Sequence, residues 1–109
     1  MAYPVNERGV VRLVTDRIIN KHPGAWVLKT QSTGYQRTGV PDLLVCVDGK
    51  FLGIEVKHRK PGESVEHMMQ RVSPSQWDEL RKLEEAGAVA GVVWDEETLD
   101  NLLELLTVI

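Results

Sequence analysis

Asp42, Glu55 and Lys57 are the residues of this chain whose types and spacing could do chemistry. Between them, Asp48-Gly49 separates two apolar runs, and Asp-Gly at such a place favours a two-residue hairpin turn. With Asp48-Gly49 as the loop, counting back along both strands brings Asp42 opposite Glu55. Side chains alternate along a strand, so Glu55 and Lys57 point the same way. The sequence therefore predicts two carboxylates side by side, with an ammonium group next to them.

A pair of carboxylates facing each other across a sheet is destabilising unless something offsets the repulsion. A divalent cation such as Mg²⁺ or Mn²⁺ would do so, because hard cations bind carboxylate, water and phosphate oxygens. The competing interpretation is that Asp42 only begins a strand and that Glu55 pairs with Lys57. Residues two apart on a strand face are about 6.5–7 Å apart at their Cα atoms, which is loose for an ion pair. We favour the metal site. A metal beside a lysine supports phosphodiester hydrolysis.

Glu7 is a further candidate because it shares a helical face with the apolar residues Val11, Val14 and Ile18. A carboxylate at the end of a buried stripe could reach the same metal site. It could equally do no more than favour the helix N-terminus electrostatically. The sequence leaves both interpretations open.

Gln76 stands three residues after Ser73, with Pro74 between them. This spacing is typical of a capping box, in which the glutamine side chain bonds back to the first residue of the cap. The side chain could instead point to the site and hydrogen-bond a phosphate or the attacking water. The cap explains the spacing, so the residues alone favour it.

The composition indicates one domain of 109 residues with a net charge of −3. No apolar run approaches the roughly 20 residues that cross a bilayer, and the first residues do not resemble a signal peptide. The single cysteine, Cys46, lies in an apolar run and is expected to behave as a small buried hydrophobe. These features predict a reducing, cytoplasmic compartment.

Basic residues gather around the second half of the hairpin: Lys50, Lys57, His58, Arg59 and Lys60. Phosphate attraction needs a local basic patch rather than a basic protein, so the acidic net charge does not exclude nucleic acid, and Lys50, His58, Arg59 and Lys60 are the candidate residues for binding it. A basic run by itself is more often a solvated strand end. The histidines and the cysteine show no zinc-ligand spacing.

Periodicity and turn residues divide the chain into elements. We expect helices over about Val5–Lys21, from Ser73 to Gly87 with Trp77, Leu80 and Leu83 buried, and over Glu96–Leu106. Strands are expected over Ala25–Lys29, Asp42–Val47, Lys50–His58 and Val89–Trp94, the last buried on both faces. Thr30–Gly39 is expected to be a loop, and Arg59–Val72 is polar without a clear period. A crossover between the last two strands would make them parallel. The fold class is a small α/β sandwich with a mixed sheet.

Pro41-Asp42, twelve residues and then Glu55-Val56-Lys57 resembles the PD-(D/E)xK nuclease signature. Two neighbouring segments add to the resemblance, Thr38-Gly39-Val40 before the aspartate and Ser73-Pro-Ser-Gln at the start of the following helix. Together they resemble the VRR-NUC branch, the virus-type replication and repair nucleases. The resemblance covers nearly the whole chain, residues 1–109, as in stand-alone phage and bacterial members.

The resemblance implies an αβββαβα core like that of restriction endonucleases and a DNA endonuclease that uses Mg²⁺ or Mn²⁺. It implies metal ligation by Asp42, Glu55 and the backbone carbonyl of Val56, with Lys57 as catalytic lysine. Glu7 and Gln76 match the family's helix acid and helix glutamine. Stand-alone members resemble Holliday-junction resolvases, so the resemblance implies a homodimer that acts on branched DNA in a bacterial or phage-infected cell. Two alternatives remain: a non-catalytic DNA-binding or assembly module, and a nuclease that nicks ordinary duplex.

Overall fold

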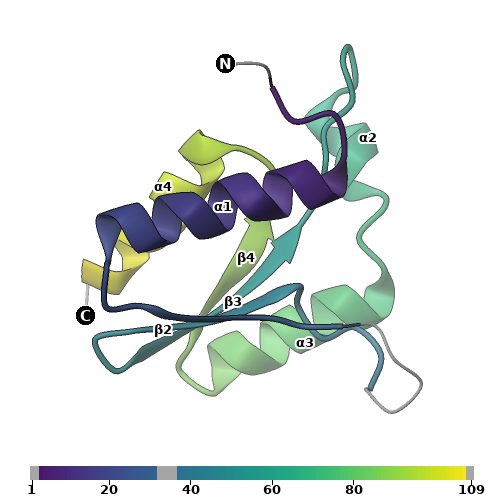
Figure 1. The fold of residues 1–109 in the computed structure, drawn as a ribbon. Helices are drawn as coiled ribbons and strands as arrows, with labels where there is room; N and C mark the ends of the chain where they lie inside the picture. The colour runs from purple at the N-terminus through teal and green to yellow at the C-terminus, as the bar shows by residue number, and fades with distance from the viewer. Residues whose placement is uncertain (1–2, 32–36, 108–109) are drawn as a thin grey trace.

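A four-stranded sheet in the order β1-β2-β3-β4 lies at the centre of the computed structural model, which describes residues 3–31 and 37–107 (Figure 1). The strands are Trp26–Lys29 (β1), Leu43–Val47 (β2), Lys50–Val56 (β3) and Val89–Val93 (β4). The first three are antiparallel, and β4 runs parallel to β3. The predicted mixed sheet with a parallel last pair is confirmed.

The turn between β2 and β3 is the two-residue loop Asp48-Gly49. Both residues have positive φ, 49° for Asp48 and 80° for Gly49, as a type I′ turn requires. Val47 pairs with Lys50, and Leu43 pairs with Ile54 at the other end of the ladder. The hairpin register predicted from the sequence is therefore confirmed.

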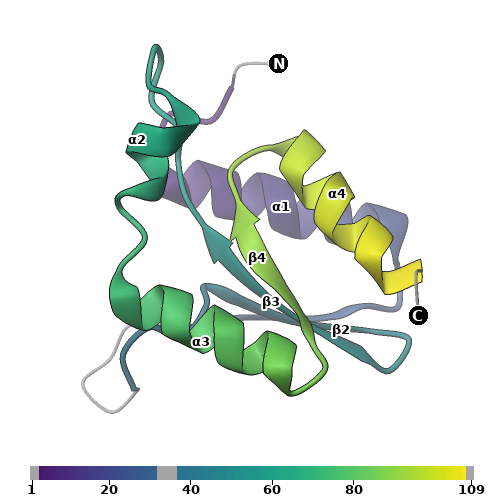
Figure 2. The same ribbon diagram turned by 180° about the vertical axis from the view of Figure 1, so that it is seen from behind.

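Two layers of helix cover the sheet (Figures 1 and 2). Helix α1 (Glu7–Lys21) and helix α4 (Glu96–Glu104), which continues into the 3₁₀ turn Leu105–Thr107, lie over one face, and helix α3 (Pro74–Glu85) lies over the other. The main core lies between the first pair of helices and the sheet, and includes Val10, Val14, Ile18, Val45, Leu52, Ile54, Leu99 and Leu103. None of the helices among the described residues is long and apolar enough to span a membrane.

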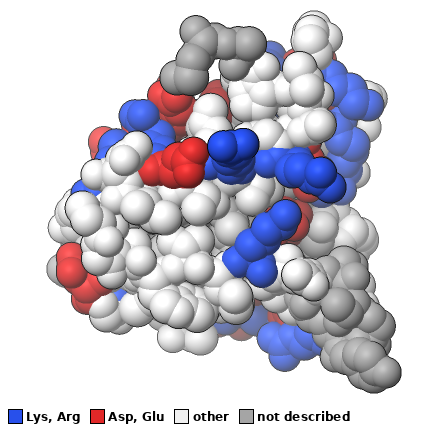
Figure 3. All heavy atoms as spheres, viewed as in Figure 1, with Lys and Arg blue, Asp and Glu red and all other residues white. Residues whose placement is uncertain are grey.

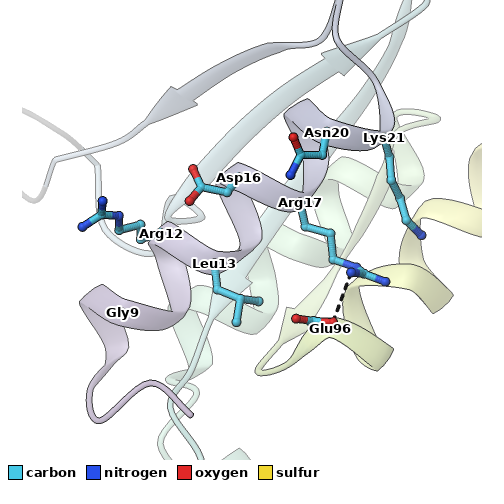
Figure 4. A pocket seen from close by; sticks show the side chains of 8 residues that line it. All are labelled: Gly9, Arg12, Leu13, Asp16, Arg17, Asn20, Lys21 and Glu96. Carbon is cyan, nitrogen blue, oxygen red and sulfur yellow. Dashed lines mark ion pairs between the residues drawn. The ribbon is translucent and has the colours of Figure 1, made fainter. Parts of the chain in front are cut away.

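Helices α1 and α4 are also joined by charged groups. Arg17 of α1 donates from Nε and Nη2 to the two carboxylate oxygens of Asp100 at 2.9 and 2.7 Å, and it also pairs with Glu96 at 3.1 Å (Figure 4). Lys21 adds a third donor to Asp100 at 2.8 Å. A groove of about 480 Å³ runs along this side of α1, and none of the predicted site residues lines it (Figure 4).

The polar segment Arg59–Val72 is folded, which the sequence did not predict. It contains a short helix, α2 (Val65–Met69), that begins at the N-cap Ser64. Met68 is fully buried and Val72 nearly so, which shows that the segment is packed. The five residues of α2 are too few to show a helical period in the sequence. Only the apolar side chains in the segment indicated packing. Residues 59–72 are called the α2 lobe below.

Three further expectations differ from the structure. Trp77 is 45% exposed, because α3 turns Gln76, Glu79 and Leu80 inward instead. Strand β4 is half-buried over most of its length, because it lies at the edge of the sheet. Cys46 is also half-buried rather than buried. The predicted loop Thr30–Gly39 falls partly on residues 32–36, which lie outside the described residues.

Candidate metal centre

Asp42 and Glu55 lie side by side at the open end of the hairpin. The ladder ends with Leu43 opposite Ile54, so the next pair outward is Asp42 and Glu55. The backbone N–H of Val56 donates to Oδ2 of Asp42 at 2.8 Å, which fixes the aspartate against β3. The two carboxylates therefore meet as the sequence predicted.

Glu55 is a buried carboxylate whose oxygens are only partly satisfied. The residue is 1% exposed, and Oε1 has no hydrogen-bond partner among the described residues. Burial first, and the nearby Asp42 carboxyl second, raise the pKa of Glu55 to about 8. A buried polar atom without a partner is costly, and a cation would compensate it.

Glu7 reaches the same place from the first turn of α1. One carboxylate oxygen from each of Glu7, Asp42 and Glu55 lies within 4.8 Å of the others. Partial burial raises the pKa of Glu7, against the opposing effect of the Lys57 ammonium. Of the two interpretations of Glu7, the structure supports the one that directs it to the site. Its catalytic role remains a prediction.

Gln76 both caps helix α3 and contacts Glu55, the two roles that the sequence presented as alternatives. Its Oε1 accepts from the backbone N–H of Ser73 at 2.8 Å, and its own N–H donates to Oγ of Ser73 at 3.2 Å, which completes the capping box. Its Nε2 donates to Oε2 of Glu55 at 3.1 Å. The helix cap and the carboxylate cluster are thus joined by one side chain.

Lys57 follows directly after β3 and is 8% exposed. Its N–H donates to the carbonyl of Val93 at 3.0 Å, so pairing with β4 holds its backbone beyond the end of the strand. Its Nζ lies 3.7 Å from Oε2 of Glu55, a loose ion pair of the kind expected for residues two apart on one face. The ammonium group is therefore fixed at the edge of the carboxylate cluster.

The basic residues predicted to bind DNA do not all lie together. Lys50 is at the turn end of β3, where Nζ donates to the carbonyl of Leu106, whereas His58, Arg59 and Lys60 follow the other end of that strand. Nε2 of His58 lies 2.9 Å from the carbonyl of Pro4. DNA binding by these four residues remains a prediction.

Arg71 is a basic residue near the site that sequence reasoning missed. It donates to the carbonyl of His58 and to the carboxylate of Glu63, and its charge acts on the carboxyl of Glu7. Arg71 lies at the end of the polar segment Arg59–Val72, where the sequence shows no period that would indicate its position near the site. Figure 3 shows further Lys and Arg side chains over α1 and beside α2 on the face that α1 crosses.

These residues fit a divalent cation that prefers oxygen ligands. Three carboxylates converge, one buried oxygen has no other partner, and no histidine or cysteine belongs to the cluster among the described residues. Such a donor set suits Mg²⁺ or Mn²⁺ rather than zinc. Asp42, Glu55 and Glu7 are the side chains that would hold the ion.

Comparison with known proteins connects this site to a family. A solved structure described as a VRR_NUC domain is similar to this chain, with a TM-score of 0.67 and 27% sequence identity. The similarity covers 93% of this chain and 97% of that one. No family model matches the chain, and no curated protein matches it. The resemblance to the VRR-NUC family seen in the motifs is thus confirmed over the fold, which is similar to that of a VRR_NUC nuclease domain over nearly the whole chain.

Proposed function

We propose that residues 1–109 form one nuclease domain that hydrolyses phosphodiesters in DNA with the help of Mg²⁺ or Mn²⁺. The observation that carries the proposal is Glu55, whose buried Oε1 has no described hydrogen-bond partner and whose carboxylate converges with those of Asp42 and Glu7. A buried carboxylate without a partner destabilises the fold if its role is only structural. Metal binding would explain why it is present.

The chain's own residues have distinct tasks in this proposal. Asp42, Glu55 and Glu7 hold the cation, together with the backbone carbonyl of Val56 that the family resemblance implies. Once bound, the cation supplies Lewis acidity to the phosphodiester and to a water molecule. The ammonium group of Lys57, 3.7 Å from Glu55, orients the attacking water and offsets the negative charge that develops on the phosphoryl group. Gln76 keeps Glu55 in place through Oε2.

The proposed substrate is branched DNA, cut by a homodimer in the manner of Holliday-junction resolvases. A dimer would present two sites to two strands, which one domain of this size could not. Basic side chains over α1 and beside α2 support a nucleic-acid substrate in spite of the net charge of −3 (Figure 3). The compartment that fits this substrate and the free Cys46 is the cytoplasm of a bacterial or phage-infected cell.

The test is cleavage of four DNA substrates with Mg²⁺ or Mn²⁺: a four-way junction, a flap, a single strand and a linear duplex. Preferential cutting of the junction supports the proposal. Equal cutting of all four would reject the branched-DNA part and leave a nuclease of ordinary DNA. Absence of product at every metal concentration would favour a non-catalytic module with this fold.

A further inference from the structure

The segment before Asp42, residues 37–41, is here called the 37–41 arm. It ends in a strongly fixed position: Thr30 donates from its N–H to the carbonyl of Asp42 at 2.9 Å and from Oγ1 to the carbonyl of Pro41 at 2.7 Å. Because the arm leads directly into Asp42, its placement sets the position of one proposed metal ligand.

The arm packs on the first turn of α3 without space for a side chain. Gly39 has φ of 89°, and a Cβ on this residue would lie 2.3 Å from the carbonyl oxygen of Ser75 and 2.9 Å from the nitrogen of Gln76. The backbone of the arm therefore contacts the helical turn that carries Gln76. Asp42 and Gln76, from distant parts of the chain, are thus placed relative to each other by this contact.

An ion pair between exposed Arg37 and buried Glu79 holds the arm one turn further along α3. Glu79 is 5% exposed, and its carboxylate pairs with the guanidinium of Arg37, whose Nη2 lies 3.3 Å from Oε2. Lys82 approaches the same carboxylate only to 4.0 Å. The side chain of Arg37 is 75% exposed, so the pair joins an exposed cation on the arm to a buried anion on the helix.

Glu79 is an unusual residue at a buried position, because its side chain is charged. The other walls of the small cavity beside it, about 140 Å³, are mostly apolar and include Val40, Pro41, Leu44 and Leu83. A leucine would fill such a place without the cost of burying a charge. A charge at this position can, however, attract the arm specifically through Arg37, which an apolar side chain cannot.

We infer that Arg37 and Glu79 are positioning residues for the metal centre: their pairing holds the 37–41 arm on α3, so that Asp42 and Gln76 reach Glu55 together. Neither residue contacts the proposed metal site itself. The inference rests on the proposed function, because it concerns metal binding by Asp42 and Glu55. Groups that orient metal ligands typically change metal affinity about 10–100-fold when they are replaced.

The experiment measures Mn²⁺ binding by electron paramagnetic resonance for the wild type, Glu79→Gln, Arg37→Gln and Arg37→Lys. The first two substitutions are expected to weaken binding about 10–100-fold, and Arg37→Lys, which keeps the charge, is expected to retain most of the affinity. The metal concentration for half-maximal cleavage should rise in parallel, while the rate at saturating Mn²⁺ stays within about twofold of the wild type.

Arg81→Gln is the matched control. It removes an arginine that pairs with Asp78 and Glu85 on the exposed side of the same helix, and it should leave Mn²⁺ affinity unchanged. Circular dichroism of each variant confirms folding, and Arg37 is exposed enough that its replacement should be tolerated. Mn²⁺ affinities of folded Glu79→Gln and Arg37→Gln within twofold of the wild type would overturn the inference. A wild type that binds no Mn²⁺ would instead overturn the proposed metal centre.

Discussion

Gln76 donates a hydrogen bond to Oε2 of Glu55 at 3.1 Å, while its own Oε1 accepts the backbone N–H that begins α3. The start of a helix and the proposed metal centre therefore depend on one amide side chain. A change at Gln76 is therefore expected to affect both the helix cap and the carboxylates.

Gln76→Ala should lower both helix stability and metal affinity. The lost cap is expected to cost about 1 kcal/mol, or roughly 4–8 °C in melting temperature for a domain of this size. The lost donor to Glu55 should weaken Mn²⁺ binding, which titration calorimetry measures.

Ser73→Ala separates the two effects, because it removes the hydroxyl that accepts the Gln76 N–H but leaves the bond from Gln76 to Glu55. It should lower the melting temperature by a similar amount and leave Mn²⁺ affinity nearly unchanged. Equal losses of affinity in both variants would show that Gln76 acts only through the cap.

The stability of the metal-free protein should fall as the pH rises toward 8. The pKa of Glu55 is raised from 4.5 to about 8 in the folded state, mainly by burial. A carboxyl with a raised pKa contributes stability that is fully present below 4.5 and is lost as the pH rises through about 8. The raised pKa of Glu7 acts in the same direction. Melting temperatures in EDTA between pH 5 and pH 9 measure the effect.

Two comparisons sharpen the pH experiment. Glu55→Gln, which cannot ionise, should show a clearly flatter dependence over this range. Added Mn²⁺ should raise the melting temperature of the wild type more at pH 8 than at pH 6, because the ion binds the deprotonated carboxylate. A wild-type dependence as flat as that of Glu55→Gln would contradict the account of this carboxyl.

Glu63→Gln should loosen the α2 lobe. The carboxylate of Glu63 accepts from Arg71, from the N–H of Lys60 and from His67, and these contacts lower its pKa to about 2, Arg71 having the largest effect. Its contribution is therefore present above 4.5 and is lost as the pH falls through about 2. At pH 7 the variant should show faster amide exchange across residues 59–72.

Glu66→Gln, an exposed change on the same short helix, is the control for that experiment and should leave exchange in the lobe unchanged. Exchange in α4 should be the same in both variants, because the main contacts of α4 are with β4 and α1. Unchanged exchange in Glu63→Gln would mean that Met68 and Val72 alone hold the lobe.

Most of the site could be predicted because its geometry follows from local rules. The Asp48-Gly49 turn fixes the register, and the register alone brings Asp42 beside Glu55. For Glu7 the sequence predicted only the helical face on which it lies. Whether it reaches the site depends on how α1 packs against the hairpin, which is a contact between distant segments. The role of Gln76 could not be decided from the sequence, because its side chain serves both purposes that the sequence presents as alternatives.

The missed features share a physical cause, which is packing between distant segments. The period of α3 was taken from Trp77, Leu80 and Leu83, but Glu79 and Gln76 are turned inward by partners from other elements. The helix in the α2 lobe is too short for a period, and its buried Met68 depends on packing that no local pattern encodes. The half-exposed β4 follows from its place at the sheet edge, which strand order decides.

The most direct test of the central claim is cleavage of a four-way DNA junction by the wild type, Asp42→Asn and Lys57→Ala in Mn²⁺ and in EDTA. Asp16→Asn, which changes an exposed carboxylate of α1, is the control. We predict that the wild type and the control cut only with metal. Both site variants should remain folded and lose at least about 100-fold in rate. Undiminished cleavage by either folded site variant, or wild-type cleavage in EDTA, would contradict the account.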